Sequence, residues 1–206
     1  MTLTYAEASL TEFAEKLSAK TSTPGGGAAC AYTAVLGAAL NEMVGNFTVG
    51  KEKYADNEPE IVELMDKTSG IRTELMHLVD CDAAAFNALK SAYAMPKETL
   101  ERSLAVEAAL KGAAEVPISV MRLSEELMKI AVRLSEIGNQ SLVSDAGCAL
   151  ELCLAAVKAS LMNVTVNTES MTDRTVAECI ESEAKDIANR CQELEAGVYR
   201  KLTDKN

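Results

Sequence analysis

The sequence predicts an all-α fold, an antiparallel helical bundle that forms a single domain over residues 1–206. Alanine and leucine abound, whereas Trp is absent and aromatic residues make up only 4% of the chain, a composition typical of helices rather than sheets. Apolar residues recur at three- and four-residue spacing through most of the sequence. No linker or shift in composition divides the chain, and its length suffices for one sizeable core.

Three helices are predicted in the N-terminal half. Thr4 and Glu7 match the pattern of a capping box, so a first helix is expected to begin there. A second helix is predicted over about residues 28–48, where apolar residues keep the spacing of a helix for four turns. A third and long helix is predicted from Pro59, a residue favoured in the first turn, to about Tyr93.

The C-terminal half is predicted to continue the bundle. A fourth helix begins near Thr99, and Pro117 either kinks this helix or opens a fifth one. Ser144 is predicted to cap the next helix, which a short β-branched stretch at 163–167 follows. Thr172 is predicted to cap a terminal amphipathic helix.

Charge and cysteine content narrow the class of protein. The formal net charge of −11 argues against nucleic acid as a partner, because phosphate neutralisation needs clustered Lys and Arg. An anionic ligand would have to be held by local features that work against the overall field. Six cysteines without Cys-x-x-Cys spacing, and no signal-peptide pattern, predict reduced thiols in the cytoplasm. With a single histidine and no cluster of ligands, no metal site is predicted.

The second predicted helix is unusually poor in charge. Residues 28–48 contain only Glu42 as a charged residue and are about as long as a membrane span. Their Ala, Gly, Asn and Thr content is too weakly apolar for such a span, and no basic loop flanks it, so no membrane contact is predicted. A helix buried on all sides fits better. Because one bundle of this size would struggle to cover it, we expect a homodimer.

The segment Thr23-Pro24-Gly25-Gly26-Gly27 is the most informative for function. Consecutive glycines can reach positive φ and carry no Cβ that would block a ligand. Since a helix follows, they lie at its N-terminus, where free N–H groups and the helix dipole can receive an anion. The segment predicts a small-molecule site, and a flexible hinge is the competing interpretation. It is not a P-loop, because no Gly-Lys-Ser/Thr follows.

Two carboxylates in apolar surroundings are the candidate catalytic groups. Asp80 and Asp82 stand two residues apart in the third predicted helix, so they point to different sides of it. At least one is therefore expected to face the interior or a cleft, where desolvation raises the pKa of a carboxyl group toward the range useful for general acid or base catalysis. The alternative is a capping or salt-bridging aspartate. His77, one turn earlier, is expected to be a surface or ion-pairing residue.

Other polar residues are weaker candidates. Ser144 and Asp145 lie at a predicted helix start and could serve as a cap or contact a ligand. Asn163 and Asn167 stand among apolar neighbours and need hydrogen-bond partners if they are buried. Lys97 follows a proline at a break in the helical pattern, a position typical of a loop and also of an anion contact.

These motifs together are similar to a known family. In chain order they are Thr23-Pro24-Gly25-Gly26-Gly27, Phe47-Thr48-Val49-Gly50-Lys51-Glu52-Lys53-Tyr54, Asp80-x-Asp82-x-x-Ala85-Phe86, Met95-Pro96-Lys97, Ser144-Asp145-Ala146-Gly147 and Leu161-x-Asn163-Val164-x-Val166-Asn167. Over nearly its whole length the chain resembles the cyclodeaminase domain of formiminotransferase-cyclodeaminase and its stand-alone relatives, which include methenyltetrahydrofolate cyclohydrolases. It departs from the pattern at Ala28, where serine is usual, and at Met95, where leucine is common.

The resemblance implies a homodimer with a folate pocket and no metal or redox cofactor. It implies conversion of 5-formiminotetrahydrofolate to 5,10-methenyltetrahydrofolate and ammonia by general acid/base catalysis. A cyclohydrolase of the same fold and a non-catalytic folate-binding helical dimer are the alternatives. Asp82 is the first choice for the catalytic carboxylate and Asp80 the second. Lys51, Lys53 and Lys97, with the glycine-rich helix start, are expected to attract the anionic folate tail.

Overall fold

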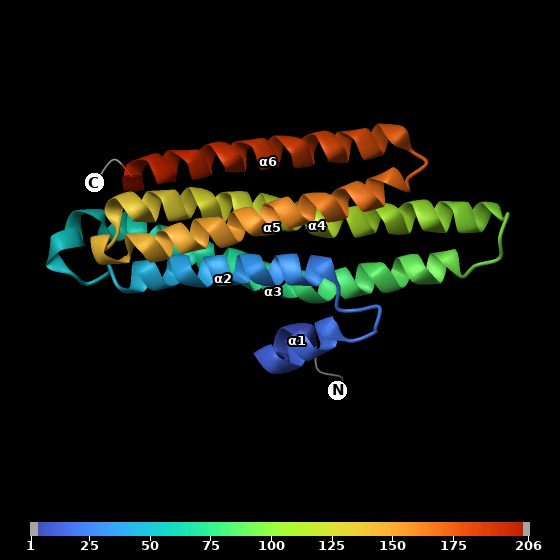
Figure 1. The fold of residues 1–206 in the computed structure, drawn as a ribbon, viewed down its shortest axis with the longest axis horizontal. Coiled ribbons are helices and arrows are strands. Elements are labelled where there is room, and N and C mark those ends of the chain that lie inside the picture. Colours follow the sequence, from blue (N-terminus) through green and yellow to red (C-terminus); the bar gives the residue numbers. More distant parts are fainter. Residues whose placement is uncertain (1–3, 204–206) are drawn as a thin grey trace.

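The computed structural model describes the backbone of residues 4–203 and the side chains of residues 4–196. Over this range the chain is all-helical, as predicted (Figure 1). The α-helices are α1 (Leu10–Ser18), α2 (Gly26–Asn46), α3 (Glu58–Tyr93), α4 (Leu100–Ile137), α5 (Val143–Glu169) and α6 (Arg174–Thr203). Short 3₁₀ turns, η1 (Tyr5–Glu7), η2 (Glu52–Asn57) and η3 (Gln140–Leu142), precede α1, α3 and α5.

The long helices form an antiparallel bundle in which each runs opposite to the one before it (Figure 1). α2, α3, α4 and α5 pack around a common core, and α6 lies along α4 and α5. Fully buried side chains of the four central helices meet in that core, among them Val44, Leu75, Met121 and Leu150. α1 lies outside the bundle, where its Phe13 ring packs 5.5 Å from the ring of Tyr32 on α2.

The helices differ in length, and this difference determines where along the bundle the candidate site lies. α2 has 21 residues and α3 has 36, which correspond to about 32 Å and about 54 Å of helix. α2 therefore starts partway along α3, and α3 and α4 extend well beyond it (Figure 1). Beyond Gly26, the first residue of α2, the groove between α3, α4 and α5 has no fourth central helix to fill it.

The first helix begins later than the sequence predicts. The Thr4 N–H does donate to the Glu7 carboxylate, but only the η1 turn follows. A second capping box starts α1: the Ser9 N–H donates to the Glu12 carboxylate at 2.9 Å, and the Glu12 N–H donates to the Ser9 hydroxyl at 3.2 Å. The stronger capping pair lies five residues further along the chain, and the helix starts there.

Two predictions in the C-terminal half are resolved or corrected by packing. Pro117 lies inside α4, which remains a single helix from Leu100 to Ile137. The stretch 163–167, which the sequence analysis set apart from the preceding helix as a short β-branched stretch, belongs to the last turns of α5. Within it Val164 is fully buried in the core, and such tertiary contacts outweigh the modest helix propensity of β-branched residues.

Both predicted caps in this half are wrong. Ser144 is the second residue of α5, and Leu142 occupies the N-cap position. Asp173, not Thr172, caps α6, because its carboxylate accepts from the Val176 N–H at 3.2 Å. In each case a neighbouring residue has the backbone geometry of the cap, and the short polar pattern cannot distinguish such adjacent positions.

Within the part of the chain that the structure describes, one helix is apolar enough, by length and composition alone, to cross a membrane, and it is not the predicted helix over residues 28–48. It is α5 with the preceding turn, residues 140–169, of which 44% of the most apolar window is buried within the chain. α5 contacts α2, α4 and α6, so packing against three neighbours accounts for its apolar surface.

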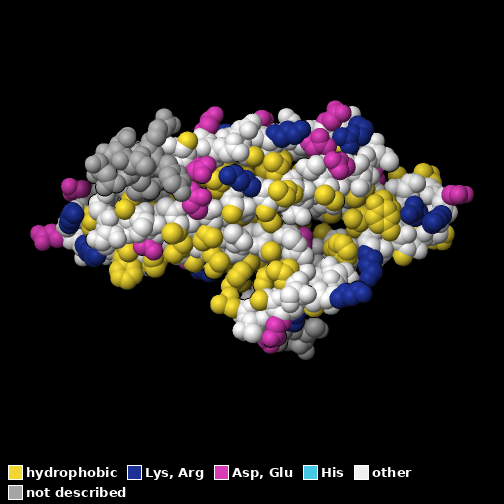
Figure 2. Space-filling view, in the orientation of Figure 1, with side chains coloured by type: hydrophobic (Ala, Val, Ile, Leu, Met, Phe, Trp, Pro, Cys, Tyr) yellow, Lys and Arg dark blue, Asp and Glu magenta, His cyan; other side chains and the backbone are white. Residues whose placement is uncertain are grey.

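The expectation that α2 is buried on all sides is wrong for the single chain. A stripe of apolar side chains that are only partly covered runs at helical spacing along it: Tyr32, Leu36, Leu40, Met43 and Phe47. Leu36 is 43% exposed and Phe47 is 56% exposed. Figure 2 shows hydrophobic side chains gathered over α2 and α1 along this side of the molecule. We call these five residues the α2 stripe.

Candidate active site

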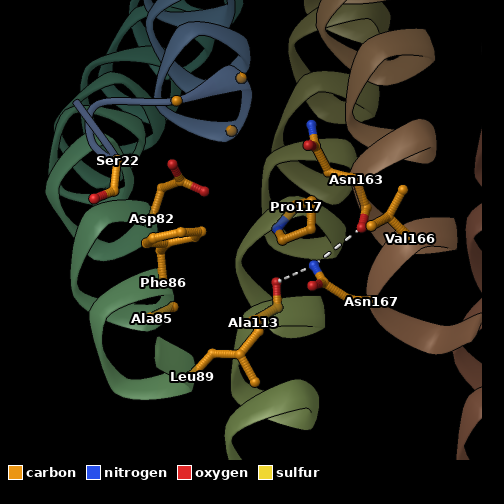
Figure 3. Close-up of a pocket in the computed structure, with 13 residues that line it drawn as sticks. Ser22, Asp82, Ala85, Phe86, Leu89, Ala113, Pro117, Asn163, Val166 and Asn167 are labelled. Atoms are coloured by element: carbon orange, nitrogen blue, oxygen red, sulfur yellow. Dashed lines mark hydrogen bonds between the residues drawn. The ribbon is translucent and has the colours of Figure 1, made fainter. Parts of the chain in front are cut away.

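A pocket of about 340 Å³ opens where α2 begins. Side chains from α3, α4 and α5 and the backbone of the glycine segment line it (Figure 3). The lining residues are Ser22, Gly25, Gly26, Gly27, Asp82, Ala85, Phe86, Leu89, Ala113, Pro117, Asn163, Val166 and Asn167. The pocket thus brings together three of the motifs that the sequence separates by more than fifty residues each.

Asp82 is the only carboxylate among these lining residues. Its side chain packs directly against the first turn of α2, where a Cβ added to Gly27 would lie 2.7 Å from the Asp82 Cγ. Burial raises the pKa of the Asp82 carboxyl, and a hydrogen bond from the Ala28 backbone N–H opposes this rise by favouring the ionised form. Asp82 is therefore a half-buried carboxyl group with a raised pKa, facing a pocket, as general acid/base catalysis requires.

The glycines serve close approach rather than an unusual backbone conformation. Among the described residues Gly50 is the glycine with positive φ, so the expectation of positive φ at the glycine segment is wrong. Gly25 is extended, with φ −125° and ψ −164°. Gly27 leaves room for Asp82, whereas a Cβ at Gly26 would stand 3.6 Å from the Asn163 amide oxygen, an ordinary contact. Pro24 follows a cis peptide bond, is buried and is not among the residues lining the pocket.

Two asparagines form the wall that α5 contributes. The Asn163 amide nitrogen donates to the Ala159 carbonyl at 3.2 Å and lies 3.7 Å from the Cys30 sulfur. The Asn167 amide nitrogen donates to the carbonyls of Ala113 and Asn163, at 3.0 Å each (Figure 3). The amide nitrogens of both asparagines thus have the hydrogen-bond partners that burial requires, and both residues line the pocket.

Asp80 has a different environment. Its carboxylate accepts from the Tyr5 N–H at 2.7 Å, and the Tyr5 hydroxyl lies 3.0 Å from the Thr23 hydroxyl. This chain of contacts ties the N-terminal turn to the residues just before the glycine segment. Asp80 thus lies on another side of α3 from Asp82, as the two-residue spacing predicts, and outside the pocket lining.

The predicted lysine contacts and the predicted contacts at the start of α5 are not among the residues lining the pocket. Lys51 and Lys53 follow the C-terminal end of α2, about 32 Å from its start. Ser144 and Asp145 lie at that same end of the bundle, in the first turn of α5. Lys97 is exposed in the α3–α4 connection. No lysine or arginine is among the residues lining the pocket.

Sequence reasoning missed part of the lining, notably Ser22, Pro117 and Val166. A signal for Pro117 was present: a proline inside a helix leaves the carbonyl four residues earlier without its helical partner, and such a carbonyl attracts another donor. His77, expected at the surface, is exposed and lies 3.3 Å from the Cys81 sulfur. Among the residues the structure describes, no cluster of three or more His, Cys, Asp or Glu could hold a metal ion.

Comparison with known proteins agrees with this architecture. A family model described as formiminotransferase-cyclodeaminase matches residues 9–186. Methenyltetrahydrofolate cyclohydrolase of Methylorubrum extorquens is 34% identical over 197 residues, which cover 94% of this chain and 95% of that protein. Formimidoyltransferase-cyclodeaminase of Rattus norvegicus is 33% identical over 171 residues, covering 81% of this chain and 32% of that protein, so the chain corresponds to about a third of its length.

A solved structure extends the likeness to three dimensions. The crystal structure of formiminotetrahydrofolate cyclodeaminase from Thermotoga maritima superimposes with a TM-score of 0.89 at 31% identity and covers 96% of each chain. The sequence motifs, the helical bundle and these matches agree over almost the whole chain. The chain therefore belongs to the formiminotransferase-cyclodeaminase family.

Proposed function

We propose that the chain is a formiminotetrahydrofolate cyclodeaminase, which converts 5-formiminotetrahydrofolate to 5,10-methenyltetrahydrofolate and ammonia. The observation that carries the proposal is Asp82, a half-buried carboxyl group with a raised pKa that faces a pocket of about 340 Å³. This volume lies within the usual range for small-molecule sites. The relatives named for folate chemistry supply the substrate class.

The reaction needs a group that accepts a proton and later returns it. N10 of the folate attacks the formimino carbon on N5, the N10–H bond breaks, and the C–N bond to the amine then breaks. The formimino group enters protonated, as –CH=NH2+, so the proton that Asp82 takes from N10 and delivers to the amino group of the tetrahedral intermediate is the third hydrogen of the ammonia that leaves, and the methenyl cation remains. A carboxyl group whose pKa is raised is a better proton donor near neutral pH than an ordinary one, because more of it is protonated. Such a group contributes about 10²- to 10⁴-fold in rate.

The rest of the pocket suits an aromatic, bent ligand. Phe86 lies one turn after Asp82 on the same face of α3 and is 42% exposed, so its ring is free to stack on the ligand. Leu89 and Val166 add apolar surface, and Gly25, Gly26 and Gly27 at the start of α2 also line the pocket. A pocket that holds the folate bent brings N5 and N10 together, and such positioning supplies several kcal/mol of the barrier, about 7 or more in well-oriented systems.

A cyclohydrolase is the second candidate, and the full-length similarity to the Methylorubrum extorquens enzyme favours it. In that reaction water attacks the methenyl carbon, and Asp82 accepts a proton from the water. The same pocket and the same carboxyl group serve both reactions, so no described residue separates them.

Two absorbance assays separate these activities. With 5-formiminotetrahydrofolate as substrate, the cyclodeaminase proposal predicts enzyme-dependent growth of the methenyltetrahydrofolate band and release of ammonia. With methenyltetrahydrofolate in ammonia-free buffer, a cyclohydrolase instead accelerates loss of that band. Acceleration of the second reaction alone would overturn the first proposal in favour of the second. Tight binding of both folates with no turnover would indicate a non-catalytic folate-binding protein.

We also propose that a second copy of this chain covers the α2 stripe. The stripe runs from Tyr32 to Phe47 without a charged residue among its members, and a self-complementary apolar surface is typical of symmetric dimers. A two-fold axis across the middle of the stripe, near Leu40, sets the two α2 helices antiparallel. That arrangement places one copy's Lys51 and Lys53 beside the glycine segment of the other copy.

This dimer would give the pocket the positive charge that its own chain lacks. The folate tail is anionic, and the lining contains neither lysine nor arginine. Lysines supplied by the neighbouring copy would attract the tail against the chain's net charge of −11. Truncating both lysines is then expected to weaken the binding of polyglutamylated folates more than the binding of the monoglutamate.

Mixed dimers test the arrangement. Asp82→Asn and the double variant Lys51→Ala/Lys53→Ala are each expected to be poorly active alone. In a dimer of one copy of each, one pocket carries both changes and the other carries neither. Random mixing is therefore expected to restore about one quarter of the parental activity. Activity no higher than the mean of the two separate variants would show that each pocket uses lysines of its own chain or none.

A further inference from the structure

Pro117 changes the hydrogen bonding of α4 beside the pocket. Proline has no backbone N–H, so the carbonyl four residues earlier loses its partner within the helix. That carbonyl belongs to Ala113, and the Asn167 amide nitrogen donates to it at 3.0 Å across the α4–α5 interface. A side chain of α5 thus takes the place of the missing N–H, and the two helices are joined at the pocket wall (Figure 3).

The hydrogen bonds of Asn167 fix which way its amide points. Its second N–H donates to the Asn163 carbonyl, also at 3.0 Å. Both partners are carbonyl oxygens, which can only accept, so the nitrogen must face them and the amide oxygen must face away. In Figure 3 the amide of Asn167 lies at the end of a side chain that points from α5 toward α4, across the pocket from Asp82 and Phe86.

Asn163 is oriented by the same logic. Its nitrogen donates to the Ala159 carbonyl, and its oxygen faces the start of α2 near Gly26. No described residue donates a hydrogen bond to the side-chain oxygen of Asn163 or of Asn167. Two amide oxygens without a donor among the described residues therefore belong to side chains that line the same pocket as the Asp82 carboxylate.

We infer that Pro117 is a positioning residue, which holds the Asn167 amide oxygen as a specificity-determining acceptor for N–H donors on the edge of the bound heterocycle. The inference rests on the proposed folate site and adds the chemical group that the α5 wall recognises. The 2-amino-4-oxopyrimidine edge of a pterin carries two such donors, the 2-amino group and N3–H. A site built to accept these hydrogen bonds discriminates against a ligand that lacks them, because the acceptor is then left desolvated and unpaired.

Binding of two ligands to matched variants tests this inference. The ligands are 5-formyltetrahydrofolate, a stable analogue of the formimino substrate, and its 2-desamino-2-methyl counterpart, which lacks the amino donor. The parent chain is expected to prefer the first by about 10- to 100-fold. Asn167→Ala is expected to abolish this preference to within about twofold. Pro117→Ala, which restores an N–H that competes for the Ala113 carbonyl, is expected to reduce the preference about three- to tenfold while Asn167 remains present.

A control variant separates orientation from general damage to the pocket. Val166→Ala removes apolar lining and leaves the two asparagine side chains in place. It is therefore expected to lower the affinity for both ligands equally and to keep the ratio of the two affinities. Full preference retained in Pro117→Ala would overturn the positioning role, and full preference in Asn167→Ala would overturn the acceptor role. A parent chain that binds both ligands equally would contradict this inference and leave the folate site standing. A parent chain that binds neither would contradict the proposed function itself. Far-ultraviolet circular dichroism confirms that each variant is folded.

Discussion

Asp82→Asn is expected to lower kcat by about 10²- to 10⁴-fold, the range of one positioned general acid or base. The substitution keeps the size of the side chain and an oxygen that can accept from the Ala28 N–H, but it removes proton transfer. The measurement is kcat and KM for 5-formiminotetrahydrofolate. Asp80→Asn is the matched control on the same helix: its oxygen can still accept from the Tyr5 N–H, so kcat is expected to stay within about threefold. An equal loss in both variants would contradict the assignment of the chemistry to Asp82.

The same variant is expected to raise the stability of the fold at neutral pH. Burial raises the pKa of Asp82 in the folded chain above its ordinary value, so the folded state binds this proton more tightly than the unfolded state. The stabilisation is fully present below the ordinary pKa of aspartate and is lost as pH rises through the raised pKa of the folded state. Asn at this position has no charge, so the folded variant avoids the cost of burying an ionised carboxylate near neutral pH. Urea unfolding is expected to show the variant as the more stable chain at pH 7 and no such advantage at pH 3.

Gly27→Ala is expected to be the most damaging change after substitution of Asp82, with activity reduced about 10²-fold or more because proton transfer depends on a positioned group. The new Cβ would overlap the Asp82 carboxylate, which must then leave its place against the first turn of α2. Measurement of kcat for the proposed substrate tests this expectation. Full activity in Gly27→Ala would show that the position of Asp82 in the pocket is not required for turnover.

Gly70→Ala is the control for this substitution. A Cβ at Gly70 meets nothing within 4 Å, and the residue lies inside α3, so alanine is expected to leave activity unchanged and to stabilise the fold by about 0.5–1 kcal/mol. Gly26→Ala has an ordinary contact with Asn163 and is expected to fall between the two in activity. A ranking in which Gly26→Ala is worse than Gly27→Ala would indicate that ligand contact, rather than room for Asp82, constrains this segment.

The helical bundle was predictable from the sequence because a long helix repeats its apolar spacing over many turns. The third predicted helix runs to Tyr93 in both the prediction and the structure, since many turns of apolar spacing support it. The cap predictions that rested on a single residue were wrong: α5 begins before Ser144, with Leu142 at the N-cap position, and Asp173 caps α6 in place of Thr172. The helix was not predicted to continue through residues 163–167, because their conformation depends on burial of Val164 against other helices, which no local sequence pattern shows.

The candidate site was predictable in its residue types but not in its geometry. Asp82, the glycines, Asn163 and Asn167 do meet in one pocket. Positive φ was the wrong explanation for the glycines. Gly27 has to be a glycine because the side chain of Asp82, 55 residues further along the chain, occupies the place of a Cβ. Such contacts depend on where α2 starts relative to α3, a relation between two helix lengths that no motif contains.

The roles of Lys51 and Lys53 stay predictions, because the structure places them at the far end of α2 from the pocket of their own chain. A motif pattern shows which residues belong together, but it cannot show whether one copy or two bring them there. The homodimer and the cytoplasmic location stay predictions as well; the six cysteines are free thiols, a state that reducing compartments maintain.

The most direct test of the account is the position of a bound folate. A crystal structure with 5-formyltetrahydrofolate is predicted to show the ligand between α3, α4 and α5, with N10 within hydrogen-bonding reach of Asp82 and the pyrimidine edge against Asn167. Density for the folate elsewhere, for example in the groove between α5 and α6 lined by Arg174 and Lys185, with the pocket at Asp82 empty, would contradict it.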